Sequence, residues 1–319
     1  MRSTRWVLWM LASACTGGNS GPPMITALDP TVAGTHGTLW EDISPELGVR
    51  SGGFPPTIQA RMHAPERTDS PAPMVVLLPS SDARTDEWFD TATWLSTWGM
   101  VVIVPAFDAP ANARTHAGLV EDTAALLAWL QSNALPLEGV ETDARKFGLL
   151  GHGRGGKIAV LAAAGDDRVG SVMVLSPDDS LPTVSTPPKD WPHALPKAAG
   201  KVTVPRLVVG AALNGTDGDV CYDPADAYPA FFAAFGAGAT EFELPNASPT
   251  DFVDPCAAGG GSLACASCPG SDDPAASARF ARAAAVAFFA STLTDETGFE
   301  GWLDGSADGF PDDVVVTTK

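Results

Sequence analysis

Residues 146–160 read K-F-G-L-L-G-H-G-R-G-G-K-I-A-V. The apolar run from Phe147 to Leu150 leads into a turn dense in glycine, and the residues from Lys157 to Ala164 then favour a helix. A strand, a tight turn and a helix in this order form the joint at which α/β proteins place their chemistry. The stretch therefore predicts an α/β fold with a functional site at this turn.

Three motifs overlap on the turn. Gly151, Gly153 and Gly156 fit the dinucleotide-binding fingerprint G-x-G-x-x-G. The turn also fits the phosphate-loop spacing G-x-x-x-x-G-K, although Ile158 stands where the magnesium-binding Ser or Thr belongs. Finally, it fits the nucleophile elbow G-x-S-x-G, with Gly153 in the serine position. Spacing alone leaves all three interpretations open.

The sequence before the turn separates the alternatives. Both nucleotide-binding folds usually place the glycine loop in their first strand–helix unit. Here several strand-like runs, among them Met74–Leu78 and Met100–Val104, and two helix-like runs, residues 85–98 and 115–132, come first. With these flanks the chain resembles the chlorophyllase and bacterial polyester-hydrolase branch of the α/β-hydrolases, whose elbow in chlorophyllases reads G-H-S-R-G-G-K.

The resemblance covers residues 56–293 and implies an α/β-hydrolase fold, a doubly wound, mostly parallel sheet with helices on both faces. Gly153 then occupies the position of the nucleophile. The sequence S-P-D-D at 176–179 resembles the family's D-P-V-D and implies that Asp179 is the acid of the triad. Likewise D-F-V-D at 251–254 resembles D-M-L-D, which places Pro249 in the position of the catalytic histidine.

The resemblance also implies an oxyanion loop formed by Ser81 and Arg154. Ser80 and Ser81 follow the strand-like run that ends at Pro79, and Ser80 replaces the glycine with which this loop usually begins. A backbone amide persists through any side-chain change except a change to proline, so the amide of Ser81 remains a candidate donor.

Acyl transfer in this fold requires a hydroxyl nucleophile and an imidazole that accepts its proton. Gly153 and Pro249 supply neither group. We therefore interpret the chain as a catalytically inactive hydrolase homologue that binds a small hydrophobic or ester ligand and needs no cofactor or metal. The first alternative is an active carboxylic-ester hydrolase with relocated catalytic residues. The second is a nucleotide-binding protein that uses the G-x-G-x-x-G turn. The hydroxyls nearest the expected site are those of Ser80, Ser81, Ser176 and Ser248.

The charge of the chain excludes one class of partner. Asp and Glu total 38 against 19 Lys and Arg, giving a formal net charge of −19. A polyanion would be repelled, so we expect no nucleic-acid partner.

The first fifteen residues are typical of an export signal. Arg2 and Arg5 precede a short apolar stretch, and A-S-A-C ends at Cys15 like the cleavage site of a bacterial lipoprotein. The alternative is an ordinary secretory signal with an incidental cysteine. We expect lipidation of Cys15, a tether over residues 16–36, a hydrolase domain over 37–294 and an acidic tail over 295–319. The protein would then be held at the cell envelope by its lipid anchor.

Four further cysteines remain. An even number in an exported chain predicts two disulfides, for which three connectivities are possible. Zinc binding through the C-x-x-C at 265–268 is the weaker alternative, because no histidine lies nearby in the sequence. The cysteines are Cys221, Cys256, Cys265 and Cys268.

Overall fold

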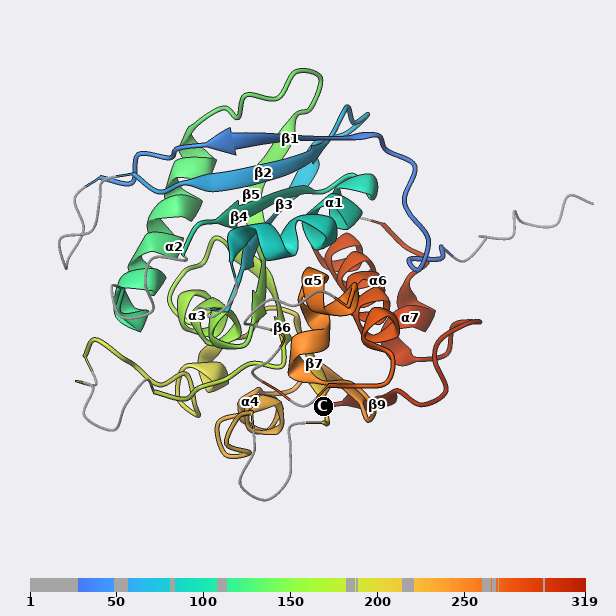
Figure 1. The fold of residues 1–319 in the computed structure, drawn as a ribbon. Helices are drawn as coiled ribbons and strands as arrows, with labels where there is room; N and C mark the ends of the chain where they lie inside the picture. Colours follow the sequence, from blue (N-terminus) through green and yellow to red (C-terminus); the bar gives the residue numbers. More distant parts are fainter. Residues whose placement is uncertain are drawn as a thin grey trace, which may run out of the picture.

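A sheet between two layers of helices forms the body of the protein (Figure 1). The computed structural model describes residues 28–48, 57–80, 84–107, 114–181, 187, 189–213, 221–259, 265, 268, 270–294 and 296–319. The strands are β1 (Thr38–Ile43), β2 (Ala60–Pro65), β3 (Ala72–Leu78), β4 (Val101–Pro105), β5 (Thr142–His152), β6 (Val169–Leu175), β7 (Arg206–Ala211), β8 (Ala239–Leu244) and β9 (Val315–Thr318). The α-helices are α1 (Phe89–Thr97), α2 (His116–Ser132), α3 (Arg154–Ala163), α4 (Tyr228–Ala234), α5 (Asp254–Ala257), α6 (Pro274–Leu293) and α7 (Glu300–Asp304).

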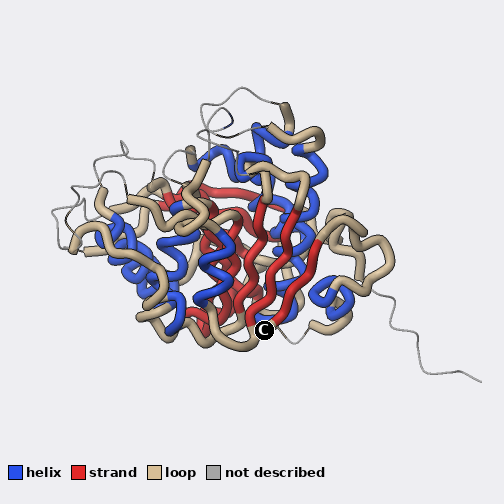
Figure 2. Tube along the Cα trace, turned by 90° about the horizontal axis from the view of Figure 1, so that it is seen from below, coloured by secondary structure: helices blue, strands red, loops and turns tan. Residues whose placement is uncertain are grey.

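The strand order confirms the predicted fold class. Among the described residues the sheet runs β1-β2-β4-β3-β5-β6-β7-β8-β9. The strands from β4 to β8 in this order pair in parallel, whereas β1, β2 and β9 pair antiparallel at the two edges. Parallel neighbours need crossover connections, and these place helices on both faces (Figure 2).

The apolar strands supply a core to each face. In β3, Met74, Val76 and Leu78 pack in the cluster that includes α2, α3 and α4, whereas Val75 and Leu77 pack in the cluster that includes α1 and α6. Successive side chains of a strand point to opposite faces, so a strand covered on both sides has to be apolar throughout. This explains the uninterrupted apolar run that the sequence shows at residues 74–78.

The N-terminal part of the domain begins earlier than predicted. The expected tether reached residue 36, yet the backbone amide of Gly34 donates to Thr97 Oγ1 at 2.9 Å and that of His36 to the Thr97 carbonyl at 3.0 Å. A Cβ on Gly34 would lie 2.1 Å from the Thr97 carbonyl oxygen, so only glycine fits there. Residues 28–36 therefore belong to the folded body, and Cys15 lies outside the described residues.

The acidic segment at the C-terminus is also part of the fold, which corrects the predicted tail. Residues 300–304 form α7, and β9 pairs antiparallel with β8. Phe299 and Trp302 are buried, and the ring of Phe310 lies 5.4 Å from that of Trp302. The acidic composition predicted a solvated tail. The buried aromatic side chains nevertheless hold the segment against the rest of the fold.

Two disulfides confirm the cysteine prediction and select one connectivity. Cys221 is bonded to Cys268, and Cys256 to Cys265. The C-x-x-C cysteines therefore have different partners, which leaves no thiolate pair for the zinc alternative. None of the helices within the described ranges is long and apolar enough to cross a membrane.

Candidate active site

The turn after β5 has the geometry of a nucleophile elbow. Gly153 lies between the end of β5 and the start of α3 with φ +52° and ψ −121°. A side chain at positive φ is strained, and glycine avoids that cost. The neighbouring glycines allow close packing of the backbone. A Cβ on Gly155 would lie only 2.0 Å from the carbonyl oxygen of Leu78, and a Cβ on Gly151 only 2.4 Å from the carbonyl oxygen of Gly155. The glycine spacing thus follows from packing the helix against β3 and β5.

Two hydroxyl groups face the side-chain position of residue 153. A Cβ built on Gly153 would lie 3.1 Å from Ser80 Oγ and 3.2 Å from the Tyr222 hydroxyl oxygen. Ser80 is buried at the end of β3, and Tyr222 follows Cys221, which the disulfide ties to Cys268. Both hydroxyls therefore border the space that a nucleophile would occupy. The predicted oxyanion residue Ser81 lies outside the described residues.

Pro249 is the first residue of the 3₁₀ turn η3 (Pro249–Phe252), which follows β8. Its carbonyl oxygen accepts a hydrogen bond from His152 Nε2 at 2.8 Å. The buried imidazole packs against Trp88 and Phe252, with ring centroids 5.1 and 6.3 Å away. This bond joins the loop after β8 to the residue that precedes the elbow. The sequence alignment therefore placed Pro249 in a loop that does contact the elbow.

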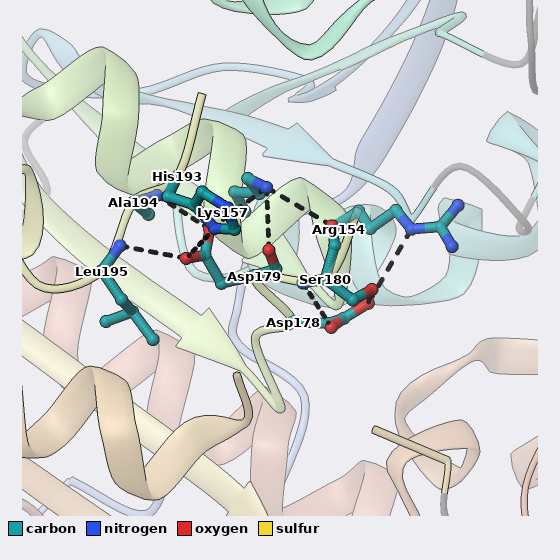
Figure 3. Close-up of polar contacts among 8 residues, drawn as sticks. All are labelled: Arg154, Lys157, Asp178, Asp179, Ser180, His193, Ala194 and Leu195. Atoms are coloured by element: carbon teal, nitrogen blue, oxygen red, sulfur yellow. Dashed lines mark hydrogen bonds and ion pairs between the residues drawn. The ribbon is translucent and has the colours of Figure 1, made fainter. Parts of the chain in front are cut away.

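Asp179, the predicted acid, is buried on the loop after β6 and accepts hydrogen bonds on both carboxylate oxygens (Figure 3). Oδ1 accepts from the amide of Ala194 at 2.7 Å and lies 3.1 Å from Lys157 Nζ. Oδ2 accepts from the amide of Leu195 at 3.1 Å and lies 3.0 Å from His193 Nδ1. Asp179 therefore contacts a histidine, but one on the segment that follows it in sequence rather than one at position 249.

Lys157, the cation paired with Asp179, has a completely buried side chain. Its Nζ also donates to the carbonyl oxygens of Asp179 at 2.9 Å and Ser180 at 3.4 Å. Burial lowers the pKa of Lys157, and the charge of Asp179 opposes that change. The lysine that ends the glycine motif is thus bound to the β6 loop and does not face a phosphate site.

Asp178 and Arg154 lie on the other side of the same loop (Figure 3). Asp178 accepts from the amide and the hydroxyl of Ser180 at 2.9 and 2.7 Å, and Arg154 Nε lies 3.8 Å from its Oδ2. Burial raises the pKa of Asp178. The Asp178 amide donates to the Gly153 carbonyl at 3.0 Å, so the β6 loop helps to hold the elbow.

A family model for chlorophyllase matches residues 62–298, which extends from β2 to the residue before Phe299. The chain belongs to the chlorophyllase family. A search of curated proteins found no match. The assignment favours the elbow over the two nucleotide-binding interpretations of the glycine turn, because chlorophyllases have the α/β-hydrolase fold.

Within this chlorophyllase-family fold, the structure brings Gly153 and the backbone of Pro249 together through His152, whereas the Asp179 carboxylate is bound to Lys157 and His193. No signal in the sequence indicated that His193 and Tyr222 lie near these positions. His193 lies in the connection between β6 and β7, for which no element was predicted. Tyr222 is brought to the elbow by a long connection after β7, and no local pattern predicts such a contact.

Proposed function

We propose that this protein is a chlorophyllase-family α/β-hydrolase that binds a small hydrophobic or ester ligand at its elbow and does not hydrolyse it. Gly153 carries the proposal, because the residue in the nucleophile position has no side chain, and the hydroxyls of Ser80 and Tyr222 border that position. Proline at position 249 adds to it, since its ring cannot transfer a proton.

A hydrolase without its triad keeps only a small part of its catalytic power. Enzymes of this mechanism that lose a triad member retain roughly 10³- to 10⁴-fold acceleration over water, from substrate binding and the oxyanion hole. Here two of the three positions lack a suitable group. Glycine at the strained elbow also avoids a cost of about 1–3 kcal/mol, so the substitution favours stability over chemistry.

A fluorophosphonate probe and nitrophenyl esters of short and medium chain length test this proposal. We expect the disulfide-intact protein to give no covalent adduct by intact mass and no hydrolysis above the buffer rate. An adduct mapped to a single serine would refute the inactive interpretation.

Ser80 is the hydroxyl that supports the second candidate, an active ester hydrolase with a relocated nucleophile. Its Oγ lies 3.1 Å from the built Cβ of Gly153, whereas Ser176 Oγ accepts from the Ala211 amide and buried Ser248 Oγ bonds Thr250. Should an adduct form, Ser80→Ala would remove it in this candidate and Ser176→Ala, the matched control, would not.

We also propose that the mature protein is anchored at the cell envelope through a lipid on Cys15. The basic residues, the A-S-A-C sequence and the tether that follows it support this proposal. Each acyl methylene contributes about 0.8 kcal/mol to membrane binding, so several chains anchor the protein firmly. Wild-type protein should enter the detergent phase of a Triton X-114 extraction, and Cys15→Ser should shift it to the aqueous phase. Equal partition of both proteins would exclude the anchor.

A further inference from the structure

We propose that Asp179, His193 and Asp226 form a binding site for a divalent transition-metal ion such as Zn²⁺. One ligand atom from each of the three side chains lies within 4.8 Å of the other two. This inference concerns the face of the β6 loop that is turned toward His193, and it does not depend on whether the elbow is active.

The distances suit a shared ion. His193 Nδ1 and Asp179 Oδ2 are 3.0 Å apart. Two ligands bound to one tetrahedral zinc at about 2.0–2.2 Å lie ~3.3 Å from each other, so small side-chain movements would admit the ion between them. The ion would replace the hydrogen bond of this pair, with the imidazole proton moving to Nε2. A second carboxylate, that of Asp226, completes three protein ligands, which a simple His–Asp hydrogen bond would not require.

The buried ligand is held in place before any ion arrives. Asp179 is 1% exposed, and Lys157 together with the Ala194 amide holds its Oδ1. The other oxygen, Oδ2, accepts from the Leu195 amide at 3.1 Å and faces His193, so an ion would bind at its second lone pair. The backbone amide of Asp179 also donates to the Asp226 carbonyl at 2.9 Å, which fixes the two aspartates relative to each other. Such supporting contacts orient the ligands of protein metal sites.

The same three residues border a pocket, and two of them, His193 and Asp226, are partly exposed. The pocket has a volume of about 480 Å³, and its other walls include Leu195, Pro196 and Ala230. The His193 side chain is 49% exposed. A zinc ion with three protein ligands would therefore keep its fourth position open to the pocket, as in zinc sites that bind water or a small ligand.

The charges around the site favour a cation. The carboxylates of Asp178 and Asp223 lie close enough to Asp226 to act on it electrostatically, in addition to that of Asp179. The Lys157 ammonium offsets one of these charges at Oδ1. We therefore expect a micromolar rather than a nanomolar affinity. The imidazole selects for zinc and similar ions over Mg²⁺, which prefers oxygen ligands.

Isothermal titration of the metal-stripped, disulfide-intact protein with ZnCl₂ tests the proposal. We expect one Zn²⁺ per chain, with affinity reduced at least ten-fold in His193→Ala and in Asp226→Asn. Both residues are partly exposed, so both variants should fold, and their circular dichroism spectra verify this. His36→Ala and Asp308→Asn are matched controls outside the ligand set and outside the group of carboxylates around it, and both should bind as the wild type does.

Four results would overturn the site. The first three are the absence of saturable binding by the wild type, binding that survives in both site variants, and binding of MgCl₂ as tight as that of ZnCl₂. The fourth is loss of binding in His36→Ala, which would assign the ion to a different histidine. None of these results depends on ester hydrolysis, so the inactive elbow and the metal site fail or succeed separately.

Discussion

At the scale of single residues, position 153 combines a conformational and a chemical effect. Its positive φ would strain any side chain, and its surroundings leave a Cβ 3.1 Å from Ser80 Oγ. A serine here would keep that strain only because the surrounding structure fixes the turn. Glycine avoids the strain and has no side chain, and the hydroxyls of Ser80 and Tyr222 lie beside its position.

Restoring chemistry should require two residues together. A serine introduced by Gly153→Ser has no base, and a histidine introduced by Pro249→His has nothing to activate, so we expect measurable ester turnover only in the double variant. The gain should be modest, because the Asp179 carboxylate is bound to Lys157 and His193. Turnover of a nitrophenyl ester by both singles and the double checks this.

A third variant tests whether Ser80 crowds a side chain at position 153. Ser80→Gly added to the double variant removes the hydroxyl nearest to residue 153 and should raise turnover further if that contact misplaces the new serine. Gly153→Ser should cost about 1–3 kcal/mol of unfolding free energy, so folding is verified by urea titration. A folded double variant no faster than its singles would show either that the oxyanion loop at Ser80 and Ser81 has also diverged or that Pro249 does not occupy the position of the histidine.

At the scale of elements, strand β8 holds the carboxyl group of Glu241 where ionisation is unfavourable. Glu241 lies in β8, and its Oε1 is buried without a hydrogen-bond partner among the described residues. Burial, and next the charge of Glu243, raise its pKa from 4.5 to about 7. The folded state therefore keeps a proton that the unfolded state has already released. Stability then falls as pH rises from about 4.5 to about 7.

The variant Glu241→Gln should reveal this cost. It keeps the shape of the side chain but cannot ionise, so it should exceed the wild type in unfolding free energy by roughly 1–3 kcal/mol at pH 8 and by little at pH 4.5. Urea titrations at both pH values measure the difference. Glu41→Gln, on the exposed face of β1, is the matched control. A gain that is the same at both pH values would contradict the argument.

At the scale of the whole molecule, the two ends of the described chain close the fold. Residues 28–36 bind the end of α1, and the segment from Phe299 to Lys319 extends the sheet by one strand. Trp302, Phe280 and Phe310 form an aromatic group under α6, with ring centroids 5.4–6.3 Å apart. The acidic C-terminus therefore contributes to stability.

Truncating the buried indole should show this contribution. Trp302 is 3% exposed, and Trp302→Ala should reduce the unfolding free energy by about 3–5 kcal/mol, because it leaves a cavity between α6 and α7. Val315→Ala on the same segment is the control, since Val315 is 51% exposed and should change stability by no more than ~0.5 kcal/mol. Similar unfolding midpoints for Trp302→Ala and the wild type would mean that the segment is dispensable.

The sequence by itself determined the layered α/β architecture, the elbow and the presence of two disulfides. These features follow from local signals: continuous apolar runs at residues 74–78 and 100–104, glycines at fixed spacing, and an even number of cysteines. The resemblance to chlorophyllases predicted that Gly153 and Pro249 stand at the nucleophile and histidine positions, and this stays a prediction.

Only the tertiary structure decided which groups meet. Three contacts join residues that are apart in the sequence. They are the pairing of Cys221 with Cys268, the cluster of Asp179 with Lys157 and His193, and the approach of Tyr222 to the elbow. Loop conformations depend on packing between elements distant in sequence, which no local pattern encodes. For the same reason the acidic C-terminal segment resembled a tail, although its aromatic side chains pack against Phe280 of α6 and Phe242 of β8, which are distant in the sequence.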